Sequence, residues 1–331
     1  MSFQHAGIIG AGSWGTALGV LLHENKLSVT VWGHDAAHIE QVATTRENAA
    51  YLPGIRLPEA LHLTADLAAL AGCDLVLLVT PSKAVRAVAA RLATTALSTD
   101  AVLLSCTKGV ERGSGLRMSE ILAECLPRNP VAVLSGPSHA EEVVRKMPTA
   151  VVLGSARADV RHRLQQTFAT SFFRPYTSED VAGIELGGAL KNIFALAAGA
   201  SDGLGLGDNA KAALITRSLA ELIRLGVALG GRRETFQGLS GIGDLMVTCF
   251  SRHSRNRAVG ERLGKGECLA DIIASMNMVA EGVPTTYSAH ECARRLGVDT
   301  PIIEQVRALL DGVVGPRETA TNLITREPKA E

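Results

Sequence analysis

The 331-residue sequence has few aromatic residues and no excess of either charge. Aromatic residues make up 4% of the chain, and 33 lysines and arginines balance 33 aspartates and glutamates. Proteins that bind nucleic acid usually need a basic surface, often with aromatic side chains on which bases stack. The composition is that of an ordinary globular protein, and we expect no nucleic-acid partner.

The sequence also lacks paired cysteines and a recognisable export signal. Its six cysteines form no C-x-x-C pair, and their spacing suggests neither a disulfide framework nor a zinc site. The first apolar run is interrupted by glycines and has no basic region ahead of it. No apolar stretch approaches the length of a membrane span. We therefore expect a cytoplasmic protein with reduced cysteines and no membrane insertion.

The first half of the chain alternates short apolar segments with helical ones. Continuously apolar strands separated by crossover helices predict a parallel sheet that is covered on both faces. The sequence therefore predicts an α/β fold. The predicted strands span residues 6–9, 29–32, 74–79, 101–104 and 131–134, with further strands at 149–153 and 172–176, and the intervening helices include 16–23, 83–92 and 116–126.

The second half has a different pattern. After about Asp180 the strand signals nearly vanish, and apolar residues recur at helical spacing. We expect a first domain over residues 1–182 and an all-helical second domain over residues 183–331. Helices are predicted at residues 188–200, 209–229, 244–247, 257–263 and 285–296.

A glycine-rich turn lies between the first predicted strand and the first predicted helix. Its residues run Gly10-Ala11-Gly12-Ser13-Trp14-Gly15. In dinucleotide-binding sheets, glycines at these three positions allow a tight turn, close approach of a pyrophosphate, and close packing of helix on strand. The positive end of the helix then faces the anion. The first domain is therefore predicted to be a doubly wound Rossmann domain that binds a nicotinamide dinucleotide.

The residues after the second predicted strand bear on which dinucleotide binds. An acidic residue in this region usually holds the ribose hydroxyls of NAD, but here Trp32 is followed by Gly33, His34 and Asp35. Histidine can pair with a 2′-phosphate, so NADP(H) and NAD(H) both stay open. Asp35 either contacts the ribose or caps the next helix. His34 and His38 have the i, i+4 spacing of metal ligands, but no third ligand is apparent, and we expect no metal.

Two later loops follow predicted strands at the edge where open α/β sheets bind their ligands. Lys108 lies in a loop of small residues after residues 101–104, and its side chain is either solvated or in contact with an anionic substrate. Ser138 follows Pro137 after the strand at 131–134. Its hydroxyl either caps the next helix or points toward a ligand.

Lys191 lies inside a strongly apolar predicted helix. A lysine in such surroundings is costly unless it reaches solvent or serves a purpose. Burial lowers the pKa of a lysine, and a second cation such as Lys108 would lower it further. Lys191 is therefore predicted to act as a general base. Asp244 lies four residues before Thr248, and it either caps a helix or orients Lys191 and accepts a substrate hydroxyl.

The segment from Ser254 to Arg257 combines the groups that bind a phosphate monoester. It holds a hydroxyl, two guanidinium groups and an amide at the start of a predicted helix. An exposed basic loop is the alternative interpretation.

Taken together, the motifs resemble those of bacterial-type NAD(P)-dependent glycerol-3-phosphate dehydrogenases over nearly the whole chain. Their order and separations match as well as their residues. The motifs are the turn at residues 7–15, Thr107-Lys108-Gly109, Ser135-Gly136-Pro137-Ser138, Leu190-Lys191-Asn192, residues 202–209, Asp244-Leu245 with Thr248-Cys249, Ser254-Arg255-Asn256-Arg257 and residues 279–284.

This resemblance implies a role for each candidate site residue, with Lys191 as the proton acceptor. Two positions depart from the family pattern, with His139 where phenylalanine is usual and His34 where arginine is frequent. The implied substrate contacts are Lys108, Gly136, Ser138, Lys191, Asp244, Ser254, Arg255 and Asn256. The implied cofactor contacts are Gly10, Gly12, Ser13, Trp14, Gly15, His34, Tyr51, Lys108, Ala140, Arg255, Val279 and Glu281.

The function that the resemblance implies is reversible hydride transfer between dihydroxyacetone phosphate and sn-glycerol 3-phosphate, which supplies phospholipid synthesis. The expected partner is a small-molecule substrate, and a homodimer stays open. Two alternatives also stay open: a related two-domain dehydrogenase acting on another hydroxy acid or sugar phosphate, and a redox sensor that binds the dinucleotide without turnover.

Overall fold

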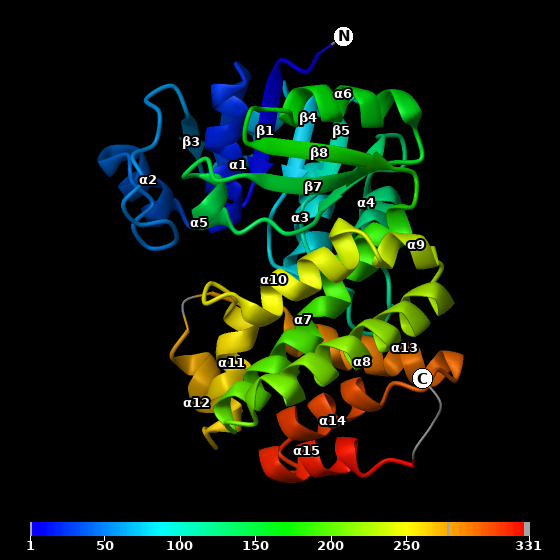
Figure 1. The fold of residues 1–331 in the computed structure, drawn as a ribbon. Helices are drawn as coiled ribbons and strands as arrows, with labels where there is room; N and C mark the ends of the chain where they lie inside the picture. The colour runs from blue at the N-terminus through cyan, green and yellow to red at the C-terminus, as the bar shows by residue number, and fades with distance from the viewer. Residues whose placement is uncertain (1, 277, 328–331) are drawn as a thin grey trace. The chain divides into compact units, whose positions relative to one another are not determined.

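The computed structural model describes residues 2–276 and 278–327, which divide into two compact units. The first unit comprises the chain up to Lys108 together with residues 117–184. The second comprises residues 109–116 and the chain from Glu185 onward. The first unit contains strands and helices, and the second contains helices (Figure 1).

The first unit is built on an eight-stranded sheet. Its strands in chain order are β1 (His5–Ile9), β2 (Ser28–Trp32), β3 (His62–Thr64), β4 (Leu75–Leu78), β5 (Val102–Ser105), β6 (Val131–Ser135), β7 (Thr149–Gly154) and β8 (Phe173–Ser178). They are arranged in the order β3-β2-β1-β4-β5-β6-β7-β8. The first six strands have the order of a doubly wound dinucleotide-binding sheet, which confirms the predicted fold. Two features were not predicted. One is the short strand β3, and the other is that β7 runs antiparallel to β6 while β8 continues parallel to β7.

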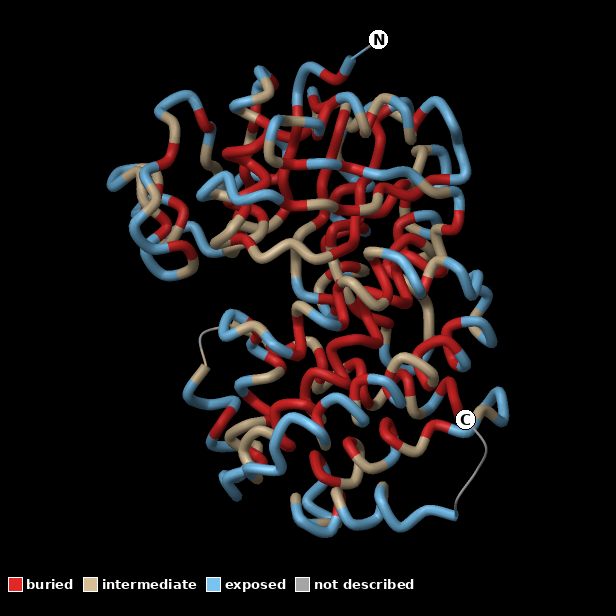
Figure 2. The backbone as a smooth tube through the Cα atoms, viewed as in Figure 1, coloured by how far each residue is buried: buried red, intermediate tan, exposed pale blue. Residues whose placement is uncertain are grey.

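The central strands form the core of this unit. All residues of β4 and β5 are buried, and so are the last four residues of β6 (Figure 2). Strands buried on both faces need helices on both sides, which is why they appear in the sequence as continuous apolar runs. The helices of this unit are α1 (Ser13–Glu24), α2 (Ala36–Thr45), α3 (Val85–Leu92), α4 (Met118–Cys125), α5 (Ala140–Val143) and α6 (Ala158–Phe168).

The second unit consists of helices, as the sequence predicts. Helix α7 (Val181–Gly203) begins in the first unit and belongs to the second from Glu185 onward. The elements that follow are α8 (Gly207–Ala228), α9 (Arg233–Phe236), the π-helical turn η3 (Leu239–Gly243), α10 (Asp244–Phe250), α11 (Arg255–Gly264), α12 (Leu269–Ala274), α13 (Gly282–Leu296), α14 (Pro301–Leu310) and α15 (Pro316–Ile324).

Helix α7 corrects one expectation from the sequence. By length and composition its 23 residues could cross a membrane, so the statement that no apolar stretch approaches that length is wrong. In the structure 83% of its most apolar stretch is buried within the protein, and Figure 2 shows this helix buried along most of its length. A helix that is apolar on all sides and covered by its own chain is the central helix of a folded core.

Candidate active site

The glycine-rich turn has the geometry that the sequence predicts. Gly10 has a φ of +123°, and a Cβ at this position would lie 2.5 Å from the carbonyl oxygen of Val79. A Cβ on Gly15 would lie 1.9 Å from the carbonyl oxygen of Gly10, so neither position accepts a side chain. Gly12 precedes the first residue of α1, and a Cβ there would meet nothing within 4 Å. This open space at the positive end of a helix fits a dinucleotide pyrophosphate.

Asn48 supports this turn and was missed by the sequence interpretation. It lies after α2 with 1% of its surface exposed. Its amide Nδ2 donates to the carbonyl oxygen of Ala11 at 2.9 Å and to Thr16 Oγ1 at 2.8 Å. The amide therefore joins the turn to the first helix. Asn48 belongs to no short motif, and only the folded chain brings it within reach of Ala11.

Of the two roles left open for Asp35, the helix cap is the one observed. Its side chain accepts a hydrogen bond from the backbone N–H of His38 at 3.1 Å, at the start of α2. His34 is exposed in the short connection after β2. The His38 ring contacts the edge of Tyr51, with the ring centroids 5.2 Å apart. Tyr51, a predicted cofactor contact, is therefore held close to α2.

Two further cofactor candidates share a small apolar cluster. Trp14, in the first turn of α1, packs against a cluster that contains Ala17, Leu52 and Ala140. Ala140 is buried as the first residue of α5. The structure thus brings Trp14 and Ala140 to one place in the first unit, and Ser13 directly precedes Trp14.

The substrate candidates of the first unit converge on one carbonyl group. The Lys108 Nζ donates to the carbonyl oxygen of Gly136 at 3.1 Å, and the Ser138 Oγ donates to the same oxygen at 3.1 Å. Of the two alternatives for Ser138, the helix cap is not observed, because His139 occupies the cap position of α5 and the Ser138 hydroxyl donates to Gly136. Lys108 is half-buried and held in place by this contact.

In the second unit, Lys191 forms a buried cluster with two side chains of α10. Lys191 is 6% exposed, Asp244 1% and Thr248 3%. The Lys191 ammonium makes an ion pair with Asp244 and donates to the Thr248 Oγ1 at 2.6 Å. Thr248 also donates to the backbone carbonyl of Asp244 at 2.6 Å, which fixes its hydroxyl. Of the roles left open for Asp244, orientation of Lys191 is the one observed.

The neighbouring residue Asn192 belongs to a second buried network. Asn256 Nδ2 donates to Asn192 Oδ1 at 2.9 Å, and Asn256 Oδ1 accepts the backbone N–H of Gly282 at 2.8 Å. A Cβ on Gly282 would lie 2.5 Å from the carbonyl oxygen of Asn192, so the start of α13 packs directly on α7. Asn256 thus joins α7, α11 and α13.

The predicted phosphate-binding segment is the first turn of a helix rather than an exposed basic loop. Ser254 caps α11 by accepting the N–H of Arg257 at 3.2 Å. Ser254 and Asn256 are buried, whereas Arg255 is exposed. The Arg255 guanidinium donates to the carbonyl oxygen of Val279 at 2.9 Å. Glu281 lies two residues after Val279 and precedes the first residue of α13. The cofactor candidates Arg255, Val279 and Glu281 are therefore close to one another.

Cys249 directly follows Thr248, and its thiol stays protonated. Burial raises its pKa to about 12, although Lys191 and Lys211 oppose this shift. A neutral thiol is a poor nucleophile. No group of three or more His, Cys, Asp or Glu side chains suited to a metal ion occurs among residues 2–276 and 278–327.

The fold and these side chains define a nicotinamide-dependent dehydrogenase, with a Rossmann unit and a helical unit that carries a buried lysine–aspartate pair. Family models confirm this class. Residues 5–161 match the model of the NAD-dependent glycerol-3-phosphate dehydrogenase N-terminus, and residues 180–321 match that of its C-terminus. The chain belongs to the NAD-dependent glycerol-3-phosphate dehydrogenase family.

Individual members of the family align with this chain over nearly its full length. Glycerol-3-phosphate dehydrogenases (NAD(P)+) from Prosthecochloris aestuarii and a Geobacter species are 48% and 50% identical, and each alignment covers 98% of both chains. The crystal structure of glycerol-3-phosphate dehydrogenase from Coxiella burnetii superposes with a TM-score of 0.94 at 38% identity, covering 98% of this chain and 99% of that one. The predicted family and its NAD(P) cofactor are confirmed.

Proposed function

We propose that this chain catalyses reversible hydride transfer between C2 of sn-glycerol 3-phosphate and a nicotinamide dinucleotide, with dihydroxyacetone phosphate as the keto partner. Family membership supports the reaction. The observation that carries the mechanism is the buried cluster of Lys191, Asp244 and Thr248, because a lysine held by two fixed partners can exchange a proton at a defined position.

The first unit supplies the candidate contacts for the dinucleotide. Gly10, Gly12 and Gly15 form the turn, and the open space at Gly12 fits the pyrophosphate. Ser13, Trp14, His34, Tyr51 and Ala140 lie on the adjacent elements. When bound, the dinucleotide supplies or accepts the hydride.

Lys191 is the proposed acid–base residue. During oxidation Lys191 starts as the neutral amine, takes the proton of the C2 hydroxyl and becomes the ammonium that pairs with Asp244. During reduction this ammonium returns the proton and becomes the neutral amine again. Asp244 and Thr248 hold the Nζ, so the proton is transferred at one position rather than by a mobile side chain. Lys108 is proposed to polarise the C2 oxygen, and Gly136 and Ser138 to hold the substrate beside it.

The first turn of α11 is the proposed phosphate site. Arg255 and the start of a helix suit a phosphate dianion. In the structure Asn256 Nδ2 already donates to Asn192, and Asn256 Oδ1 already accepts the backbone N–H of Gly282. Ser254 caps the helix and therefore fixes where the turn begins.

We also propose a metabolic role, a cellular compartment and an oligomeric state for the enzyme. Glycerol 3-phosphate would supply phospholipid synthesis, and the enzyme would act in the cytoplasm as a homodimer. All six cysteines are described and none forms a disulfide, which is consistent with a reducing compartment. Gel filtration with light scattering checks the oligomeric state.

Steady-state reduction of dihydroxyacetone phosphate with NADH and with NADPH tests the reaction. We expect oxidation of at least one of these cofactors. If neither is oxidised, the proposed function is wrong. A panel of hydroxy acids and other sugar phosphates would then identify another dehydrogenase activity, and no turnover on any of them would favour a redox sensor.

A further inference from the structure

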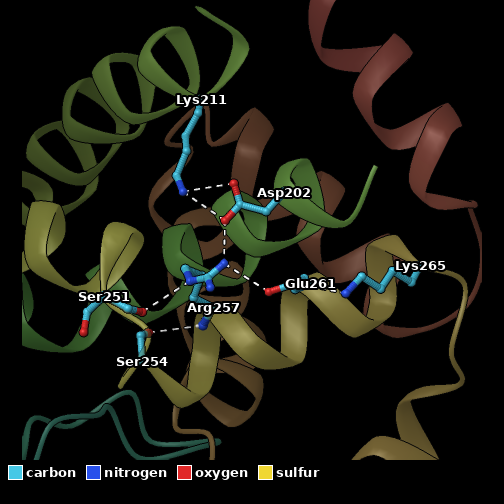
Figure 3. A network of polar contacts seen from close by, with 7 residues as sticks. All are labelled: Asp202, Lys211, Ser251, Ser254, Arg257, Glu261 and Lys265. Carbon is cyan, nitrogen blue, oxygen red and sulfur yellow. Dashed lines mark hydrogen bonds and ion pairs between the residues drawn. The ribbon is translucent and has the colours of Figure 1, made fainter. Parts of the chain in front are cut away.

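Asp202, near the end of α7, forms ion pairs with a lysine and an arginine from two other helices. The Lys211 Nζ of α8 lies 2.9 Å from both carboxylate oxygens, and the Arg257 Nη1 of α11 lies 2.6 Å from Oδ2 (Figure 3). The three side chains are only 24%, 11% and 17% exposed. Ion pairs with so little solvent contact are screened less than surface pairs. One carboxylate thus joins three helices.

The backbones of α7 and α11 are in direct contact next to this carboxylate. A Cβ on Gly199 would lie 2.0 Å from the carbonyl oxygen of Arg257, and a Cβ on Gly260 would lie 2.0 Å from that of Leu196. Glycine surfaces allow this close approach but offer no side chains that interlock. The position of α11 along α7 therefore depends on the polar contacts beside them.

Arg257 also holds the segment that leads into α11. Its Nε donates to the carbonyl oxygen of Ser251 at 3.2 Å, and its backbone N–H donates to the Ser254 Oγ at 3.2 Å. Both contacts are visible in Figure 3. Residues 251–257 are therefore closed into a compact turn, with Arg255 and Asn256 inside it.

We propose that Asp202 and Arg257 are positioning residues for the phosphate-binding turn of α11. Asp202 holds the Arg257 guanidinium, Arg257 holds residues 251–254, and together they fix Arg255 where the substrate phosphate is bound. This inference rests on the proposed function, because it assigns the turn to a phosphorylated substrate. Nothing in it requires Asp202 or Arg257 to touch the substrate.

The test replaces Asp202 with asparagine, which keeps the size of the side chain and removes its charge. We expect the KM for dihydroxyacetone phosphate to rise about tenfold, since a small displacement of a binding group weakens binding strongly. We expect kcat to change less than about twofold, and the KM for NADH to rise less than that for dihydroxyacetone phosphate, since Arg255 is one of many candidate cofactor contacts. The affinity for inorganic phosphate, measured by titration calorimetry, should fall in parallel.

Three further variants give the controls. Asp202→Glu keeps the charge and should recover most of the affinity, and Arg257→Lys should give a KM between wild type and Asp202→Asn. Glu261 pairs with Arg257 on the side away from Asp202 and also with the exposed Lys265. Lys265→Ala removes only this last ion pair and should behave as wild type. If Asp202→Asn does not fold, the comparison rests on Asp202→Glu and Arg257→Lys.

Two results would overturn the inference. One is that kcat, melting temperature and the KM values for both substrates change together, which is the pattern of a structural role alone. The other is unchanged phosphate affinity in both Asp202→Asn and Arg257→Lys. Failure of the proposed function is a separate result, because wild-type enzyme would then not turn over dihydroxyacetone phosphate at all, while phosphate affinity is measured without turnover.

Discussion

Lys191 is the residue at which the mechanism is most directly tested. Lys191→Ala should lower kcat by about 10²-fold or more, the range for loss of general acid–base catalysis. NADH should still bind, as measured by fluorescence titration. The variant also leaves Asp244 buried without its cation, which costs about 3–5 kcal/mol of stability, so activity must be measured where the variant is folded. Near-normal turnover would exclude Lys191 as the proton acceptor.

A substitution at Gly12 tests the proposed cofactor site. A Cβ at Gly12 would meet nothing within 4 Å, so we expect Gly12→Val to fold, with a cost of about 1 kcal/mol for the poorer helix cap. The valine would fill the space proposed for the pyrophosphate. We expect the Kd for NADH to rise about tenfold or more, a loss of about 1.4 kcal/mol. Gly72→Ala, also in open space, is the matched control, and equal NADH affinity in all three proteins would rule out this site.

Single residues were predictable when their immediate sequence was unusual. Lys191 stands out because its neighbours are apolar, and the glycine turn because it joins a strand to a helix. Asn48 and Asp202 could not be found in this way, since their partners are distant in sequence and are brought close only by folding. The roles assigned to the site residues stay predictions until the variants are measured.

At the scale of elements, Glu221 of α8 gives a pH-dependent contact with α14. Its buried carboxylate accepts the N–H groups of Ile302 and Ile303 at 2.9 and 2.8 Å. Burial raises the pKa of Glu221 to about 7, against an ordinary value of 4.5, although the two N–H groups and Arg224 oppose the shift. The folded protein therefore binds this proton more tightly than the unfolded chain does. The stability that it contributes is complete below about pH 4.5 and is lost as the pH rises toward 7.

The predicted consequence is a pH dependence that one substitution removes. Between pH 5 and pH 8 the free energy of unfolding of the wild type should fall by about 2.5 kcal/mol relative to Glu221→Gln. Urea denaturation of both proteins at several pH values measures the difference, in which the other titrating groups cancel. Parallel curves for the two proteins would show that Glu221 does not titrate in this range.

The sequence predicts elements well where burial dictates a pattern. β4 is apolar at all four positions and β5 at its first three because helices cover both faces, and α7 is mostly apolar because it lies inside the helical unit. Strand direction leaves no such pattern, so the antiparallel pairing of β6 and β7 was not predicted. The three-residue strand β3 is too short for its alternation to stand out. Residues 109–116 belong to the second unit and contact it, for example through Arg112 over the Tyr287 ring. These contacts are distant in sequence, so no local pattern predicts them.

At the scale of the whole molecule, the two proposed ligand sites predict a specific pattern of protection from amide exchange. NADH should slow exchange in residues 10–24 of the first unit, and glycerol 3-phosphate should slow exchange in residues 251–258 of the second, because a bound ligand suppresses local opening. Gly12→Val should abolish the first effect and keep the second. Asp202→Asn should weaken the second and keep the first. Hydrogen–deuterium exchange with mass spectrometry resolves both segments in one experiment. If saturating ligand protects neither segment, both assignments are wrong. If Gly12→Val alone loses both effects, the phosphate-binding turn depends on bound cofactor rather than on the ion pairs of Asp202.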